Sequence, residues 1–90
     1  MLSFAGIYPE TALLSSIDNM ILRTTTELAQ LVRARRTELG LTQEELANLA
    51  GLHRTSIGLF EQGRRMGGLE SILRILHTLG MDLEVHTRGG

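Results

Sequence analysis

The segment from Arg33 to Gly63 constrains the fold of this 90-residue chain more than any other part. It reads RARRTELGLTQEELANLAGLHRTSIGLFEQG, and start and stop signals for helices alternate along it. Thr42 with Glu45 three residues later is a capping box, in which each side chain bonds a backbone amide of the first helical turn. Glycine suits the left-handed turn that ends a helix, and three glycines stand at such places: Gly40, Gly51 and Gly63. The segment therefore predicts short helices separated by two sharp turns.

Apolar residues at helical spacing extend this pattern to both sides of the segment. Thr24 with Glu27 forms a second capping box, which marks the start of the first helix. The expected helices run from Thr24 to Gly40, from Thr42 to Gly51, over residues 54–61 and over residues 69–79. The residues expected in the core are Leu28, Leu31, Val32, Leu39, Leu46, Ala47, Ala50, Leu52, Ile57, Phe60, Leu69, Ile72, Leu73, Leu76 and Leu79.

After residue 80 the spacing of apolar residues changes from helical to alternating. Met81, Leu83 and Val85 are each followed by a polar residue, and a period of two is typical of a strand. A lone strand leaves its backbone groups and its apolar face without partners. The simplest partner is the same strand of a second copy. The alternation therefore predicts a homodimer joined by a two-stranded antiparallel ribbon, with these three residues at the interface.

The chain divides into three parts on this basis. Residues 1–23 form an N-terminal extension, residues 24–80 the helical domain, and residues 81–90 the dimerisation strand and tail. Within the extension, five residues have the spacing of a short amphipathic helix: Leu13, Leu14, Ile17, Met20 and Ile21. The alternative is that translation starts at Met20 and that residues 1–19 are an added extension.

Composition argues against several classes of site. The chain has no cysteine, so it has neither a disulfide nor a thiolate metal site. The histidines lack the spacing of metal ligands, so no cofactor is expected, and His53 fits a helix cap or a DNA contact better. No nucleophile elbow, phosphate loop or pair of catalytic carboxylates is visible, so we expect no enzymatic activity. Apolar runs are far shorter than the ~20 residues that span a bilayer, and no secretory signal is seen. We therefore expect a cytoplasmic protein with no membrane partner.

Three helices separated by two sharp turns form the layout of a helix-turn-helix, which reads DNA in the major groove. The run RxRRxxxGLTQEELAxxAG followed by IxxFExG resembles the lambda-repressor-like (Xre-type) family over residues 24–80. The run LESILRILHTLGMDLEV looks like the corresponding part of HipB-type antitoxins. The resemblance implies an all-α domain of four to five helices with a C-terminal β-strand that pairs across a homodimer. It also implies a repressor of its own operon that binds double-stranded DNA at a palindromic operator and restrains a HipA-like serine/threonine kinase toxin.

The resemblance also places residues at the DNA. The residues expected there are Thr42, Gln43, His53, Arg54, Thr55, Ser56, Gly58, Leu59, Arg64 and Arg65. Gln43 matches a glutamine with which the family grips phosphate and braces the recognition helix. The alternative is a solvated first-turn residue, but the phosphate contact is favoured, because amides and helix N-termini both suit phosphate. Four residues of the third helix match base-facing positions: Arg54, Thr55, Gly58 and Leu59. Arg64 and Arg65 follow that helix and are expected to clamp phosphates.

Several of these residues have a second interpretation. Arg54 fits a guanine contact, but also a surface arginine that balances a nearby glutamate. Thr55 fits a DNA contact and a brace of the first turn equally well. Gly58 either lets the backbone come close to DNA or reflects tolerated drift. Arg36 fits a structural ion pair with Glu61 better than a phosphate contact.

The net charge of −1 is low for a DNA-binding protein. Residues 33–65 nevertheless hold six arginines against four glutamates, which leaves that segment at +2. Local charge counts for more than the total, because attraction to phosphate is screened beyond ~8–10 Å at physiological salt. Two other functions stay open. One is a phage-type or general Xre-family repressor without a toxin, and the other is a protein-interaction module that has lost DNA binding.

Overall fold

The two predicted capping boxes are present, and each begins a helix. In the computed structural model, which describes residues 21–88, the Thr24 hydroxyl accepts from the Glu27 amide at 3.1 Å and the Thr42 hydroxyl accepts from the Glu45 amide at 3.0 Å. Both glutamates reach back to the amide of the capping threonine. The helices are α2 (Thr25–Glu38), α3 (Gln43–Ala50), α4 (Arg54–Glu61) and α5 (Leu69–Thr78). The predicted bounds are confirmed to within two residues. The helix proposed for residues 13–21 and the start proposed at Met20 fall almost wholly outside the described residues.

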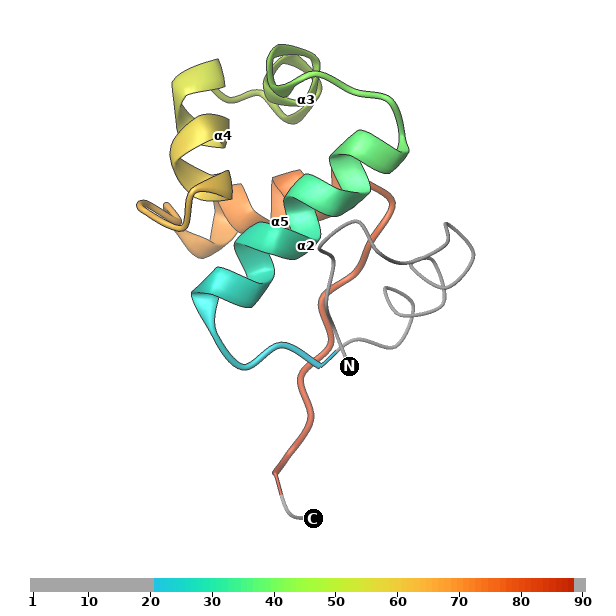
Figure 1. Cartoon of the computed structure of the whole chain (residues 1–90). Coiled ribbons are helices and arrows are strands. Elements are labelled where there is room, and N and C mark those ends of the chain that lie inside the picture. The colour runs from blue at the N-terminus through green and yellow to red at the C-terminus, as the bar shows by residue number, and fades with distance from the viewer. Residues whose placement is uncertain (1–20, 89–90) are drawn as a thin grey trace.

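The four helices enclose one apolar core. Figure 1 shows α3 and α4 above, with α2 and α5 beneath them. Phe60, Ile57, Leu46 and Val32 are each at most 1% exposed, so three of the helices meet at the centre. From α5 and its C-terminal cap, Ile75, Leu76 and Leu79 complete the cluster. Burying a side chain of this size stabilises the fold by ~1.5–3 kcal/mol. The buried cluster, to which all four helices contribute, therefore fixes the position of α4 relative to the other helices.

The predicted core is wrong at two positions, Leu39 and Leu69, and it lacks two buried residues, Ala29 and Ile75, which are each 2% exposed. Leu39 is 44% exposed, because it caps the C-terminus of α2 where the chain turns away from the core. Leu69 is 61% exposed, because it is the first residue of α5 and stands at the end of the helix. Ile75 was not predicted, yet it is only 2% exposed. The buried face of α5 is therefore centred on Ile75, Leu76 and Leu79.

The predicted C-terminal strand is absent from the described residues. Met81 still packs against the core, and its amide donates to the Leu76 carbonyl at 2.8 Å. Beyond it, residues 82–88 are exposed, have no strand assignment and extend away from the helices (Figure 1). Leu83 is 44% exposed and Val85 is 89% exposed. A strand needs hydrogen bonds from a neighbouring strand, and the single chain offers none here.

The described residues also bear on two of the predicted absences. No helix within residues 21–88 has the length and apolar character needed to cross a membrane. In the same part of the chain, no three acidic, histidine or cysteine side chains come together in a way that would hold a metal ion.

Candidate nucleic-acid interface

Helix α4 follows α3 after a turn of only three residues, 51–53. Gly51 takes a left-handed backbone conformation, with a φ of 72°, which lets the chain reverse directly after Ala50. Ile57 and Phe60 anchor the inner side of α4 in the core. The same helix therefore presents its other side to solvent, held at a fixed angle by the buried residues. This is the geometry that places a recognition helix in a DNA groove.

Three of the predicted DNA contacts are arginines that are available for a ligand. Arg54 begins α4, and Arg64 and Arg65 follow its C-terminus; all three are exposed. None of them forms an ion pair with a carboxylate in the described part of the chain. The interpretation of Arg54 as a surface arginine that balances a glutamate is therefore wrong for this structure. A guanidinium without a partner keeps all its donors for phosphate or a guanine edge.

The two arginines in the last turn of α2, Arg35 and Arg36, have structural roles. Arg35 pairs with Glu38 at 2.8 Å, and its Nε donates to the carbonyl of Leu79 at 3.0 Å. It thereby joins the end of α2 to the end of α5. One carboxylate oxygen of Glu38, Oε2, is buried without a hydrogen-bond partner among the described residues. Arg35 therefore serves the fold rather than a ligand.

Arg36 and Glu61 form the predicted structural ion pair. The Nε of Arg36 donates to Oε2 of Glu61 at 2.6 Å, and its Nη2 donates to Oε1 at 3.0 Å. The Nη1 of Arg36 donates to the carbonyl of Leu41 at 2.7 Å, in the turn before α3. The two side chains are only 11% and 3% exposed. A paired guanidinium with this many bonds satisfies a buried carboxylate, and losing either partner would leave an uncompensated buried charge.

Gln43 belongs to the same network. Its Nε2 donates to Oε1 of Glu61 at 3.1 Å, so its carboxamide lies against α4 instead of standing free in solvent. The interpretation of Gln43 as a simple solvated residue is therefore wrong. A Cβ atom built on Gly58 would meet the Gln43 Oε1 at 3.7 Å, which is an ordinary contact distance. The carboxamide thus lies beside the α4 backbone between Gly58 and Glu61.

The first turns of α3 and α4 differ in how their amides are satisfied. The hydroxyl of Thr42 caps α3 by accepting a hydrogen bond from the amide of Glu45. His53 is the N-cap residue of α4, as the sequence suggested, but its side chain makes no capping bond. Thr55 and Ser56, within the first turn of α4, are exposed. The first amides of α4 are thus free of a side-chain cap, and a helix end of this kind suits an anionic group such as phosphate.

Leu59 was predicted to lie on the solvent side of α4, and the structure does not place it fully there. It is half-buried, as is Gly58, whereas Arg54, Thr55 and Gln62 are exposed. The exposed side of α4 is therefore narrower and more polar than the sequence suggested. Leu59 has less surface to offer a base or a partner protein.

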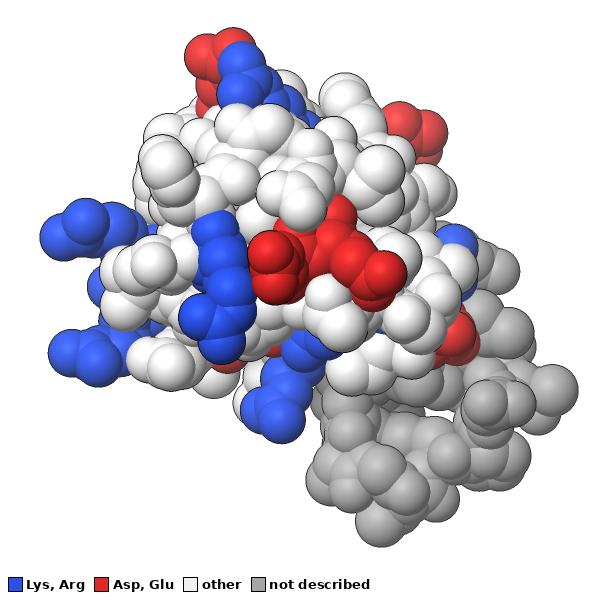
Figure 2. All heavy atoms as spheres, turned by 90° about the horizontal axis from the view of Figure 1, so that it is seen from above, with Lys and Arg blue, Asp and Glu red and all other residues white. Residues whose placement is uncertain are grey.

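The charge of this side of the molecule is mixed. Figure 2 looks down from above onto α3 and α4, and it shows carboxylates gathered near the middle with arginine side chains beside them. Glu44 and Glu45 in the first turn of α3 are exposed. Their negative charge stabilises α3 through the dipole at its N-terminus, but it repels phosphate. The free arginines must therefore supply the attraction, because the surface as a whole is not strongly basic.

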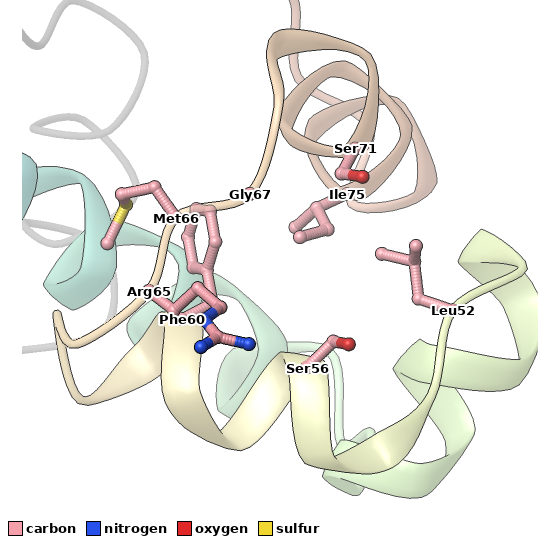
Figure 3. A pocket seen from close by; sticks show the side chains of 8 residues that line it. All are labelled: Leu52, Ser56, Phe60, Arg65, Met66, Gly67, Ser71 and Ile75. Carbon is pink, nitrogen blue, oxygen red and sulfur yellow. The ribbon is translucent and has the colours of Figure 1, made fainter.

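A small groove lies beside α4, under the loop that leads to α5. Its volume is about 70 Å³, and Figure 3 shows Leu52, Phe60 and Ile75 pointing into it. The groove is completed by Arg65, Met66 and Gly67 of the loop and by the hydroxyls of two serines, Ser56 and Ser71. Pockets for metabolites or cofactors hold ~300–1,000 Å³. The groove is too small for such a ligand, and it marks where the loop closes over the core.

The arrangement of α3, α4 and the turn between them defines a helix-turn-helix domain. The family model described as "Helix-turn-helix domain" matches residues 27–88, well over half of the chain, and the chain belongs to this family. The domain is of the Xre/lambda-repressor type, and it indicates a DNA-binding regulator. A search of curated proteins found no match to the chain.

Proposed function

We propose that this protein is a non-enzymatic, sequence-specific transcriptional repressor that binds a palindromic operator as a homodimer. The observation that carries the proposal is the exposed side of α4. There Arg54, Thr55 and Ser56 are exposed on a helix whose inner side is locked into the core. Arg64 and Arg65 extend the same surface beyond the C-terminus of α4 and have no carboxylate partner within residues 21–88. In this proposal α4 enters the major groove, and these flanking groups bind phosphates.

The remaining contacts follow from the same placement. Thr42 and Gln43, at the start of α3, lie near the backbone of the DNA in this proposal, as does His53 at the start of α4. Arg54 reads a guanine edge, where a bidentate contact is worth ~1–3 kcal/mol of discrimination. Gly58 allows close approach of the helix, and half-buried Leu59 contributes at most an apolar contact to a thymine methyl group.

Dimerisation through the tail belongs to the proposal. Met81, Leu83 and Val85 lie on one side of an alternating segment, and the last two are exposed in the single chain. Pairing two such segments would satisfy their backbone groups and cover this apolar side. Two linked recognition helices would then bind half-sites about one helical turn, ~34 Å, apart.

We also propose that the protein is the antitoxin of a HipA-like serine/threonine kinase. This part rests on the resemblance of residues 69–85 to HipB-type proteins, and no contact in the described residues bears on it. Co-expression with the product of the adjacent open reading frame, followed by purification through a tag on one partner, tests it directly. A regulator of the same fold that acts without a toxin will purify alone.

One observation favours a second function, a protein-interaction module without DNA binding. Exposed Glu44 and Glu45 lie near the proposed DNA surface, and the whole chain has a net charge of −1. A surface of mixed charge suits a protein partner better than a polyanion. One measurement distinguishes the two functions, because only a repressor binds its operator more tightly than scrambled DNA.

Fluorescence anisotropy on the DNA upstream of the gene, in a salt series, is that measurement. We expect tight, salt-sensitive binding, and we expect Arg54→Ala to weaken it by about 5- to 150-fold, which corresponds to ~1–3 kcal/mol. The unfolding temperature should not change, because Arg54 is exposed and pairs with no carboxylate among residues 21–88. Arg74→Ala is the matched control, since Arg74 is exposed on α5 and its ion-pair partner among the described residues is Glu70. Equal binding of operator and scrambled DNA would favour the interaction module.

A further inference from the structure

We propose that Glu61 is a positioning residue for DNA binding, which acts through Gln43 without touching DNA itself. The inference rests on the proposed function and adds a route by which the buried ion pair controls the DNA-binding surface. Glu61 ends α4, Gln43 begins α3, and Arg36 lies in the last turn of α2. The carboxylate of Glu61 thus joins the two helices of the helix-turn-helix to the helix that supports them.

Burial makes this carboxylate a fixed point. The Glu61 side chain is 3% exposed, and Arg36 holds both of its oxygens. Arg36 is itself anchored to the Leu41 carbonyl, two residues before Gln43. A carboxylate held by a two-bond arginine fork has little freedom to rotate. The position of Oε1 is therefore set by the fold and not by the solvent.

Gln43 takes its orientation from that oxygen. One N–H of its carboxamide donates to Oε1 of Glu61 at 3.1 Å. The carboxamide oxygen lies on the Gly58 side, where a Cβ atom would stand 3.7 Å away. The hydrogen bond from one N–H to the buried carboxylate restricts rotation of the carboxamide. Its second N–H remains for a ligand beside the first turn of α3.

A fixed carboxamide binds with less loss of freedom than a mobile one. Ordering one flexible side chain on association lowers affinity by about 2- to 10-fold, so pre-ordering it saves a similar factor. Releasing Gln43 from Glu61 should therefore weaken operator binding by that factor. It should do so only while Gln43 is present, because Glu61 has no DNA contact of its own in this proposal.

A double-mutant cycle tests this dependence. Operator affinity is measured for the wild type, Glu61→Gln, Gln43→Ala and the double variant, at a temperature where circular dichroism shows each to be folded. We expect Glu61→Gln to cost about 2- to 10-fold in the wild-type background and nothing further in the Gln43→Ala background. Arg35→Met is the matched control, since it removes another partly buried pair, Arg35–Glu38, that does not contact Gln43. Its effect should be the same in both backgrounds.

The alternatives give different results. Glu61→Gln lowers the unfolding temperature under either interpretation, because it leaves the buried guanidinium of Arg36 without its charged partner. If Glu61 only stabilises the fold, the effect of its substitution on affinity adds to that of Gln43→Ala; this overturns the inference while operator recognition stands. If the wild type binds operator and scrambled DNA equally, the proposed function fails, and the inference fails with it.

Nuclear magnetic resonance of the free protein tests the hydrogen bond between Gln43 and Glu61 without DNA. The spectra can be recorded at low temperature, where a destabilised variant is still folded. The side-chain amide signals of Gln43 are identified by their loss in Gln43→Ala. They should move in Glu61→Gln and stay in place in Arg35→Met. Signals that do not respond to Glu61→Gln would show that the carboxamide is not held, and the inference would be wrong.

Discussion

Replacing Gly58 by alanine should stabilise the fold. Gly58 lies in the middle of α4, and its backbone is not in the left-handed region. Among the described residues outside the neighbouring backbone of α4, a methyl group there would meet the Gln43 Oε1 at 3.7 Å. That distance is an ordinary contact, so no atom has to move. Glycine inside a helix costs ~0.5–1 kcal/mol relative to alanine, because the unfolded chain loses more freedom when it folds. The free energy of unfolding should rise by that amount.

Thermal and urea unfolding, followed by circular dichroism, measure the effect. For a domain of this size, ~1 kcal/mol shifts the unfolding temperature by ~4–8 °C, so a rise of ~2–8 °C is expected. All samples need the same protein concentration, because the proposed dimerisation would make the midpoint depend on concentration. Gly63→Ala is the matched control: Gly63 also has open space around it, but its φ is 72°. Alanine there should lower stability by ~1–2 kcal/mol.

A fall in stability for Gly58→Ala would refute this reasoning, because it would mean that the Gln43 carboxamide needs the space beside Gly58. The same variant also decides why glycine stands there. If α4 approaches DNA closely at Gly58, the added methyl group should crowd the complex at a cost of ~1–3 kcal/mol, or about 5- to 150-fold in operator affinity. Unchanged affinity in a stabilised protein would mean that the glycine reflects tolerated drift.

Two further predictions concern α5 and the tail. Ile75→Val should lower the free energy of unfolding in urea by ~0.5–1.5 kcal/mol, because Ile75 is 2% exposed. Leu69→Ala should change it by less than ~0.5 kcal/mol, because Leu69 is 61% exposed. Equal losses would show that α5 is rotated relative to the structure. Removing residues 82–90, which keeps Met81 in its contact with the core, should shift the protein from dimer to monomer in analytical ultracentrifugation and weaken operator binding through lost avidity. A dimer that survives this truncation would place the interface on the helices.

Local signals were sufficient to predict the helices. The capping boxes at Thr24 and Thr42 depend on residues three apart, and both formed as expected. Helix ends marked by glycine were equally local. The burial of Ile75 was also within reach, because Ile72, Ile75 and Leu79 have the spacing of one helical face. The exposure of Leu39 and Leu69 could not be predicted in this way, because each stands at an end of its own helix, and how far the core reaches along a helix depends on how all four helices pack.

The candidate site was predictable in its residue types but not in its contacts. The ion pair between Arg36 and Glu61 was expected from the pattern, and it forms. The bond from Gln43 to the same carboxylate was not expected, since the two residues are 18 positions apart and meet only because α3 and α4 pack together. Whether Arg54 is free or paired likewise depends on which glutamates come near it in the fold.

In the tail, the alternation of apolar and polar residues predicts a strand, but the described part of the single chain supplies no second strand to pair with it. Alternation in residues 81–86 would give a strand one apolar side, but alternation alone supplies no hydrogen bonds. In helices every backbone bond is made within the segment, so capping and spacing suffice for α2 to α5. In a strand every bond is made with another segment, and the described chain offers none to residues 82–88. The same sequence pattern is therefore consistent with an extended, unpaired tail in the monomer and with a ribbon in a dimer. If the protein dimerises as proposed, the pairing of two copies, and not the local sequence, turns this tail into a strand.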